Sequence, residues 1–513
     1  MKQQDLFFSP EVPIEKLSLL SKEDLIILLR GEQKIRLHLA SENQRLEALN
    51  EELKQKQLFV EEQFITIKNK LFGKSSERSQ GKKDKKDSSS NEGTKRVLLP
   101  SQRYPDAPLI ERHITLDTLP SCKCCGSQMQ DSGMTEDSEY LTKIPAQYYV
   151  VVQMRHKYRC GKCHGDIQTA PVPPRITPGS SYSDEMIIDA AVSKYCDLIP
   201  MERQAEMAAR EGFKGIPAQS LIETSHSLAD FLKSTYRRLR NEMLSSSVWH
   251  ADETPHRMLE GSESSSWYLW GFLTKTTSYF ECHDTRSGDV ASELLLKSKC
   301  EYLVSDVYSG YNKAVTDTNT IRKEKELVLI KQAYCNAHAR RYFRQASDAF
   351  PEESEFYLKQ YRKIYRLERL AQKNPDKINK IRKRMCKYFE KIRDKCLSDV
   401  GGYSSKSKLG KAMNYFLKNY EGFTRFIDNQ ELPIDNNPAE RVLRSPVIGR
   451  KTWYGTHSER GAETMAILFS IMQSCKINKV NPREYLKKLI ADLHAGKNTY
   501  TPYEFKNQVQ PEH

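Results

Sequence analysis

The first long segment of the chain repeats its apolar residues every seven positions. Residues 25–71 contain strong helix formers and no proline, and the repeat consists of Leu39, Leu46, Leu53, Val60 and Ile67. The positions four residues further on are polar at first and apolar towards the end of the segment. This pattern predicts a coiled coil within residues 1–72 and, through it, a homo-oligomer. A single amphipathic helix packed against its own domain would produce the same pattern.

The pattern then changes twice. Residues 73–98 have almost no apolar side chains and many lysines, which is typical of a flexible basic linker. Residues 99–178 contain short β-like runs, among them YYVVV at 148–152, and they end in a proline-rich stretch at 171–174. We therefore expect a small β domain after the linker.

Helical patterns dominate residues 179–245. A short helix is predicted over residues 201–210, Gly212 is a stop signal, and Pro217 can occupy the first turn of the next helix. A helix, a tight turn and a second helix of this size resemble a DNA-reading helix-turn-helix. Ordinary helical hairpins have the same appearance, so both readings stay open.

From residue 246 onwards, short strand-like runs alternate with helical ones. The runs lie at residues 248–251, 267–274, 278–282 and 302–304, with a helical piece at 290–297 and a further apolar run at 327–330. This alternation predicts a mixed α/β sheet over residues 246–344. The helical pattern of residues 345–430 is too long for a connection and indicates a helical insertion. We assign residues 431–475 to the same core and residues 476–513 to a C-terminal helical tail.

Length and charge narrow the class of protein. A chain of 513 residues is too long for one hydrophobic core, so the fold class is expected to be multidomain α/β. The net charge of +14 favours a polyanionic partner, nucleic acid above all, although a merely basic soluble protein would also fit. No segment approaches the roughly 18 uninterrupted apolar residues of a membrane helix. We expect a cytoplasmic protein without membrane contact, in which cysteines do not form a disulfide framework.

Four cysteines have the spacing of a metal site. Cys122 and Cys125 form one C-x-x-C pair, and Cys160 and Cys163 form another. Two tight turns that each present two thiolates can supply the tetrahedron of ligands that Zn²⁺ requires, which predicts a zinc ribbon. Four cysteine ligands leave no open position for water, so the zinc is expected to be structural. Cys124 is a spare ligand for the first pair, and unliganded cysteines are the alternative.

Two aspartates follow strand-like runs. Asp252 comes directly after residues 248–251, and Asp306 comes directly after residues 302–305. Each carboxylate is therefore expected at the end or the edge of a strand. If the two strands are neighbours, the carboxylates converge at one edge of the sheet.

A third acid is expected at the start of a helix. Asn436 or Asn437 can cap this helix, Pro438 fits its first turn, and Glu440 then points back towards the sheet. Three oxygen ligands on separate elements suit a pair of Mg²⁺ ions, which can stabilise the attacking and the leaving oxygen of a phosphodiester displacement. Any one of these acids alone would be read as a cap or a surface charge.

Cations and aromatic residues follow the third acid. The predicted DNA-binding residues are Arg441, Arg444, Arg450, Lys451 and Trp453. Such a tract can hold phosphates and stack bases. The alternative is a helix with a solvated basic face and aromatic residues in the core.

In combination, these motifs resemble those of the insertion-sequence 66 family of DDE transposases (TnpC-type). The catalytic blocks of the family correspond to HADET at residues 250–254, YLVSD at 302–306 and DNNPAER at 435–441. The segment CNAHARR at residues 335–341 also matches the family, as do LFGKSSER at 71–78 and the cysteine pairs.

The resemblance implies a ribonuclease-H-like core in which Asp252, Asp306 and Glu440 hold two Mg²⁺ ions. It also makes companion proteins encoded by the same element candidate partners. We therefore interpret the chain as a transposase that binds the terminal repeats of an insertion sequence, cuts a strand and joins it to target DNA. A catalytically silent DNA-binding or regulatory derivative is the alternative, and a nuclease that does not join strands is a third reading. His338 is either a phosphate or ligand contact or a structural residue.

Overall fold

The computed structural model describes residues 21–72, 99–105, 107–115, 118–130, 135–136, 138–143, 147–162, 167–259 and 266–509. The predicted linker at residues 73–98 and the predicted zinc ligand Cys163 lie outside the described residues. The chain divides into two units. The larger unit contains residues 1–74, 155–205 and 216–513, and the smaller unit contains residues 75–154 and 206–215.

The described elements are mostly helices. The first are α2 (Lys22–Phe72), α3 (Pro100–Arg103), β1 (Lys157–Arg159), β2 (Ile167–Thr169), α4 (Asp184–Tyr195), α5 (Met201–Arg210), α6 (Ala218–Phe231) and α7 (Lys233–Leu244). The central sheet and its connections comprise β3 (Val248–Arg257), β4 (Ser266–Leu273), β5 (Ser278–His283), α8 (Asp289–Leu296), β6 (Tyr302–Ser305), α9 (Ser309–Glu324), β7 (Lys331–Tyr334) and α10 (Asn336–Ala346). They are followed by α11 (Pro351–Gln372), α12 (Ile378–Lys383), α13 (Cys386–Asp399), α14 (Lys408–Lys418), α15 (Tyr420–Thr424), α16 (Asn437–Trp453), α17 (Glu459–Asn478), α18 (Pro482–His494) and α19 (Pro502–Val509).

The central sheet has five strands in the order β5-β4-β3-β6-β7. Strand β4 runs antiparallel to both of its neighbours, β5 and β3, whereas β3, β6 and β7 run parallel. The two parallel connections each contain a helix, as crossovers between parallel strands require. The sheet is therefore mixed, as the alternation of strand-like and helical runs predicted.

Both faces of the sheet are buried. One face packs on α7, α8 and α9 through large side chains that include Trp249, Trp270, Phe272 and Tyr311. On the other face, Leu269 and Phe280 pack on α17, and Val304 and Ala333 pack towards α10 and the helical insertion. Because side chains alternate between the faces along a strand, each residue of β3 is committed to one of the two cores.

Helix α17 covers the edge strand β5. Ser470 and Ser474 on this helix accept hydrogen bonds from the backbone N–H groups of Phe280 and Ser278, at 2.9 and 3.0 Å. These groups would otherwise lie unpaired on the free edge of a sheet. The arrangement explains why α17 is buried on nearly all sides.

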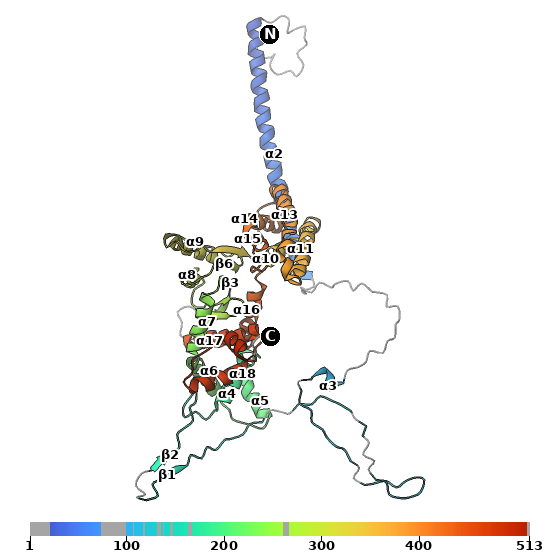
Figure 1. Cartoon of the computed structure of the whole chain (residues 1–513). Coiled ribbons are helices and arrows are strands. Elements are labelled where there is room, and N and C mark those ends of the chain that lie inside the picture. The colour runs from blue at the N-terminus through green and yellow to red at the C-terminus, as the bar shows by residue number, and fades with distance from the viewer. Residues whose placement is uncertain are drawn as a thin grey trace. The chain divides into compact units, whose positions relative to one another are not determined.

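Helices α11 to α15 form the insertion, whose aromatic and aliphatic core is continuous with α10 and with Val304 and Ala333 of the sheet. The C-terminal half of α2 docks on this insertion (Figure 1). The Glu62 carboxylate accepts the backbone N–H of Lys408 at 2.9 Å, and Gln55 donates to the carbonyl of Gly401 at 2.8 Å. None of the described helices combines the length and the apolar character that crossing a membrane requires.

Two short elements differ from their predictions. The run at residues 148–152 is not part of a strand in the described chain, and most of its side chains are exposed, so it has no sheet to pack in. The last strand is Lys331–Tyr334 rather than residues 327–330. Leu327, Val328 and Leu329 are exposed, and only Ile330 enters the core.

Candidate active site

The pairing register of the parallel strands places the two aspartates opposite each other. In this register His250 pairs with Val304, and counting two residues further along both strands gives Asp252 and Asp306. Asp306 directly follows the end of β6, whereas β3 continues beyond Asp252 in its pairing with β4. Both side chains therefore belong to the sheet face that Val304 shares with α10 and the insertion.

The third acid approaches from α16. This helix begins at Asn437 with Pro438 in its first turn, as predicted, and Glu440 lies in that turn. Ala439 and Leu443 of the same helix are buried against the sheet, beside Gly271 and Phe280. The packing of α16 thus holds Glu440 close to Asp252.

The electrostatics reflect this convergence. Burial and the neighbouring carboxylates of Glu253, Asp306 and Glu440 raise the pKa of Asp252 to about 8. Burial and the charge of Glu253 likewise raise the pKa of Asp306, although His338 and Arg286 partly oppose this effect. Among the described residues, no cation forms an ion pair with either aspartate. The site therefore gathers carboxyl groups, and the protein pairs neither aspartate with a cation among the described residues.

Asn436 fastens the start of α16 to the sheet. Its side-chain amide donates to the carbonyl of Ala251 at 2.9 Å, and its Oδ1 lies 2.8 Å from Nδ1 of His250. Its backbone N–H donates to Sγ of Cys335 at 3.2 Å. Burial lowers the pKa of His250 to about 4, so the imidazole is neutral near pH 7 and can donate to Asn436. One residue thereby sets the distance between the strand of Asp252 and the helix of Glu440.

Glu253 is a buried acid that the sequence motifs did not single out. Its side chain is 3% exposed and pairs with Arg286 at 2.6 Å. The hydroxyl of Tyr311 donates to its other oxygen at 2.6 Å. The charge of Glu253 is therefore paired with that of Arg286, on the sheet face opposite to Asp252. The role of Glu253 in the structure is to fasten β3 to α9.

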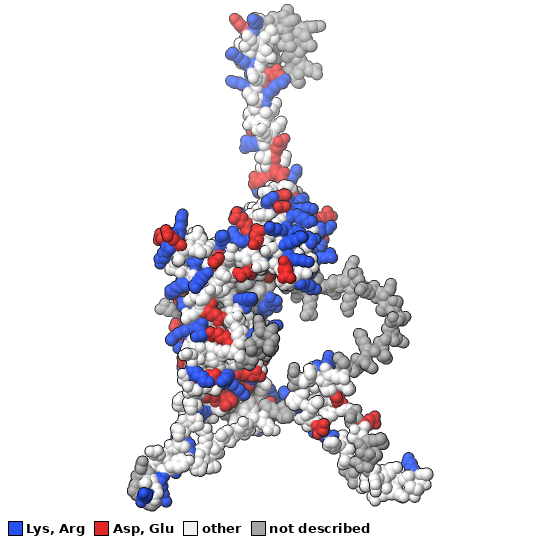
Figure 2. Space-filling model, in the orientation of Figure 1, with Lys and Arg blue, Asp and Glu red and all other residues white. Residues whose placement is uncertain are grey.

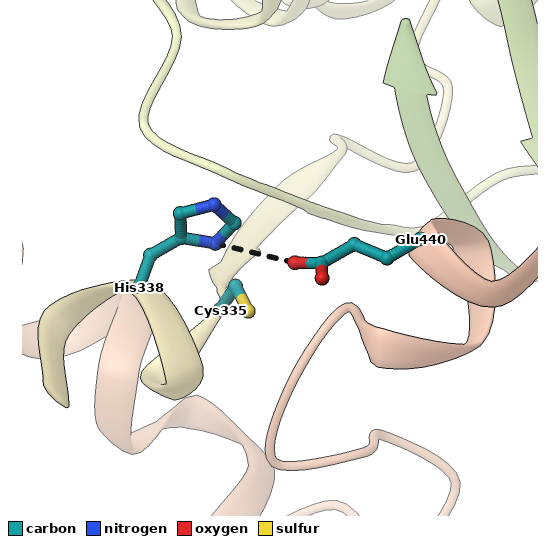
Figure 3. A group of neighbouring side chains, drawn as sticks. All are labelled: Cys335, His338 and Glu440. Atoms are coloured by element: carbon teal, nitrogen blue, oxygen red, sulfur yellow. Dashed lines mark ion pairs between the residues drawn. The ribbon is translucent and has the colours of Figure 1, made fainter. Parts of the chain in front are cut away.

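His338 and Cys335 lie beside Glu440 (Figure 3). Nδ1 of His338 is 3.7 Å from Oε1 of Glu440, and Arg341 is 4.0 Å from Oε2. One ligand atom from each of Cys335, His338 and Glu440 lies within 4.8 Å of the others. His338, whose role the sequence left open, is thus part of the site's surroundings.

The first cysteine pair lies in a tight turn of the smaller unit. The N–H of Gly126 donates to the carbonyl of Cys122 at 2.9 Å, and Gly126 has a φ of +73°, which favours glycine. Hydrogen bonds from Ser127, the largest effect, and from Cys122 lower the pKa of Cys125. A turn of this kind brings the two thiols of a C-x-x-C pair to the same side.

Cys160 of the second pair belongs to the larger unit. It directly follows β1, which pairs with β2 in an antiparallel hairpin. Its partner Cys163 is not among the described residues. The assignment of the four zinc ligands stays a prediction.

The basic tract after Glu440 lies on α16. Arg441, Arg444 and Lys451 are exposed on one side of this helix, and Arg450 is partly buried. Trp453 packs against the core instead, with its ring edge-on to Tyr195 at 6.5 Å. This packing favours the alternative of a core aromatic at position 453, whereas the three exposed cations are free to meet a phosphate backbone.

Comparison with known proteins agrees with the motifs. Residues 179–464 match the Transposase IS66 family, and residues 120–164, which include both cysteine pairs, match the zinc-finger binding domain of transposase IS66.

Relatives occur in Sinorhizobium fredii (strain NBRC 101917 / NGR234). The uncharacterized protein y4hP is 23% identical over 79% of this chain and 76% of its own length. The uncharacterized proteins y4jD and y4qI are 25% and 26% identical over 75% and 70% of this chain, and over 76% and 68% of their own lengths. The family match covers more than half of the residues, including all three acids of the site. The chain therefore belongs to the IS66 family of transposases, and it carries the zinc-finger domain of that family.

Proposed function

We propose that this transposase uses Asp252, Asp306 and Glu440 as a DDE site for Mg²⁺-dependent DNA strand cleavage and strand transfer. The observation that carries the proposal is that carboxylates on β3, directly after β6 and on α16 are close enough for Asp306 and Glu440 both to raise the pKa of Asp252. Two of them have raised pKa values because each is buried and faces like charge. A fold does not gather uncompensated acids in this way for stability.

The donor set fits Mg²⁺. Carboxylate oxygens are the ligands this ion prefers, and the raised pKa of Asp252 reports a site where bound positive charge would be stabilising. When bound, two Mg²⁺ ions would supply charge neutralisation at the attacking and leaving oxygens of the phosphodiester. The three acids would hold and orient the ions, and Asn436 ties the strand of Asp252 to the helix of Glu440.

The strand order supports a ribonuclease-H-like core. Three antiparallel strands followed by two parallel ones, in the order β5-β4-β3-β6-β7, form the arrangement that this core requires. The first acid then lies on the central strand and the second directly after its parallel neighbour. The third comes from α16, which packs on β3 and β4.

DNA binding is supported by charge on two surfaces. Residues 345–430 carry 20 lysines and arginines against 11 acids, so the insertion accounts for +9 of the net charge of +14. Figure 2 shows this basic surface around α11 and α13, where the exposed residues include Arg366, Arg369, Lys380, Lys383, Lys387 and Lys391. The second surface is the exposed side of α16. Both can contact the phosphates of the element's ends or of target DNA.

The test is an Asp252→Asn variant assayed on DNA that carries the terminal repeats. Loss of a metal ligand removes several kcal/mol of transition-state stabilisation, so we expect cleavage to fall by about 10³-fold or more while binding to the repeats persists. Asp317→Asn, which changes an exposed aspartate on α9, is the matched control and keeps full activity. Cleavage by Asp252→Asn at the rate of the parent would remove Asp252 from the site.

The same assay separates the alternatives. A transposase gives strand-transfer products with Mg²⁺ and none without it. A nuclease gives cut ends without joined products, and a silent derivative binds the repeats and gives neither.

A further inference from the structure

Cys335, His338 and Glu440 form a cluster whose chemistry differs from that of the three acids. Cys335 immediately precedes α10, His338 lies in the first turn of that helix, and Glu440 lies in the first turn of α16. Figure 3 shows His338 and Glu440 pointing towards each other, with the side chain of Cys335 beside them. Their ligand atoms lie within 4.8 Å of one another, although the residues come from two separate segments of the chain.

Two atoms of the cluster lack hydrogen-bond partners. Nδ1 of His338 and Oε1 of Glu440 are both buried, and neither makes a hydrogen bond with any residue that the structure describes. Their separation of 3.7 Å is too long for a direct hydrogen bond. Buried polar atoms are nearly always satisfied in folded proteins, so two that face each other indicate a bound atom between them.

The third member completes a ligand set. Sγ of Cys335 is fully buried and accepts the backbone N–H of Asn436 at 3.2 Å. Burial raises the pKa of the Cys335 thiol to about 12, so the thiolate would form when a bound metal ion displaces the proton. A thiolate, an imidazole and a carboxylate suit Zn²⁺ or Co²⁺ in tetrahedral coordination, whereas Mg²⁺ prefers oxygen ligands alone.

We propose that Cys335, His338 and Glu440 bind a divalent transition ion of the Zn²⁺ class, at a site that shares Glu440 with the magnesium site. The ion takes Oε1 of Glu440, Sγ of Cys335 and one ring nitrogen of His338, and a water occupies the fourth position. Arg341 lies 4.0 Å from Oε2, is more than half exposed and can turn away from the ion.

The shared carboxylate makes the site regulatory. This consequence rests on the proposed DDE function. A transition ion held by Cys335 and His338 draws Glu440 away from Asp252 and Asp306, so occupancy inhibits Mg²⁺-dependent cleavage. Release of the ion returns Glu440 to the three-acid site.

The binding test uses Co²⁺, because a cobalt–thiolate bond gives a charge-transfer absorption band that Zn²⁺ does not give. Full-length protein is first saturated with Zn²⁺, so that its zinc-finger cysteines are occupied, and loosely held Zn²⁺ is then removed by gel filtration. Addition of Co²⁺ is expected to produce the thiolate band in the parent protein. Cys335→Ala abolishes the band, and Cys300→Ala, which changes another fully buried cysteine, retains it.

A second variant guards against loss of folding. His338→Gln changes a side chain that is 24% exposed, and it is expected to weaken Co²⁺ binding by about tenfold or more without shifting the melting temperature of the metal-free protein. The same band in parent and Cys335→Ala, or no band in the parent, would overturn the proposed site.

The regulatory step has its own readout. Micromolar Zn²⁺ is expected to inhibit Mg²⁺-dependent cleavage by the parent and by Cys300→Ala, and the inhibition should be weaker in Cys335→Ala. Equal inhibition of all three proteins would refute the regulation. Because Co²⁺ binding requires no DNA cleavage, a failure of the DDE proposal leaves the binding result intact, and the two failures are distinguishable.

Discussion

Glu253 and Asp252 are adjacent acids with opposite environments. Successive side chains of a strand alternate between the faces of the sheet, so Glu253 points towards α9 while Asp252 points towards α16. Arg286, which pairs with Glu253, also lies over the ring of Tyr308 at 4.1 Å. Tyr308 donates its backbone N–H to Asp306 at 3.2 Å. Through Arg286 and Tyr308, Glu253 thus supports the loop that carries Asp306.

We predict that Glu253→Gln destabilises the core by about 1–3 kcal/mol, because it removes the charge that pairs with Arg286. Urea unfolding measures the loss. Glu293→Gln is the matched control: its pair with Lys297 is exposed and contributes less than about 1 kcal/mol. Equal losses of unfolding free energy in the two variants would mean that burial of Glu253 adds nothing to stability.

We predict that the buried side chain of His256 makes the free energy of unfolding depend on pH. Burial, with a smaller effect from Arg450, lowers the pKa of His256 to about 4 in the folded protein, against 6.5 when unfolded. The unfolded state therefore binds more protons between these values, and the stability present above pH 6.5 is lost as the pH falls towards 4. At pH 5 the loss is about 2 kcal/mol.

The variant His256→Gln tests this origin. Its free energy of unfolding should fall less between pH 7 and pH 5 than that of the parent, by about 2 kcal/mol. Parallel pH profiles for the two proteins would assign the acid sensitivity to other groups.

For single residues, the sequence predicts which acids lie near strand ends but not which side of the sheet each one faces. Asp252 and Asp306 follow strand-like runs, and the structure places both acids on one sheet face, although their catalytic role stays a prediction. Glu253 stands next to Asp252 in the motif, and sequence alone does not say which of the two acids meets α16. That distinction depends on which face of β3 each helix covers, and this is set by packing of residues far apart in the chain.

At the scale of elements, the junction between α16 and β3 holds the proposed site together. We predict that Asn436→Ala costs about 2–4 kcal/mol, because Nδ1 of His250 and the carbonyl of Ala251 both lose a buried partner. Cleavage should fall as Glu440 loses its spacing from Asp252, while binding to DNA persists.

Asn481→Ala provides the comparison for this variant. Asn481 caps α18, where its side chain accepts the backbone N–H of Arg483 in an exposed setting. Its loss should cost about 1 kcal/mol and leave cleavage unchanged. If both variants lowered cleavage alike, general instability rather than the position of Glu440 would be the cause.

Elements with strong local signals could be predicted from sequence. The helix at residues 201–210 and the start of α16 are confirmed, because a stop glycine and a first-turn proline mark them locally. Asn436 stands at the N-cap position but bonds to Ala251 and His250 instead of capping the helix. Strand β7 was misplaced because it lies at the edge of the sheet and is only half buried, so its hydrophobic pattern is weak. The apolar run at residues 327–330, which is mostly exposed, was taken as the signal instead.

On the scale of the whole molecule, α2 leaves its heptad residues uncovered. Leu39, Leu46 and Leu53 are 56%, 52% and 54% exposed, which favours a partner helix over packing on the chain's own core. We predict that the double variant Leu39→Lys and Leu46→Lys shifts the protein from oligomer to monomer, as measured by light scattering after size exclusion. The charge-matched pair Gln44→Lys and Ala48→Lys lies off the repeat and should keep the oligomer. A parent protein that is already monomeric would contradict the coiled coil.

Packing of this helix on its own chain was one of the two readings of the heptad pattern, but the residue that fastens α2 to the insertion was not predictable. Glu62 is 1% exposed and accepts the backbone of Lys408, which lies 346 residues away in sequence. A glutamate within a polar heptad segment gives no sign that it will be buried. The predicted domain boundaries rest on composition and stay predictions.

The order of the elements has a consequence for the making of the protein. Glu440 is supplied by α16, which follows β3, β6 and the entire insertion in the chain. When the ribosome has already translated Asp252 and Asp306, it has not yet translated Glu440, the third acid of the proposed site. Under the proposed function, a growing or prematurely terminated polypeptide is harmless to the host's chromosome, and the capacity to cut DNA appears only when translation passes α16.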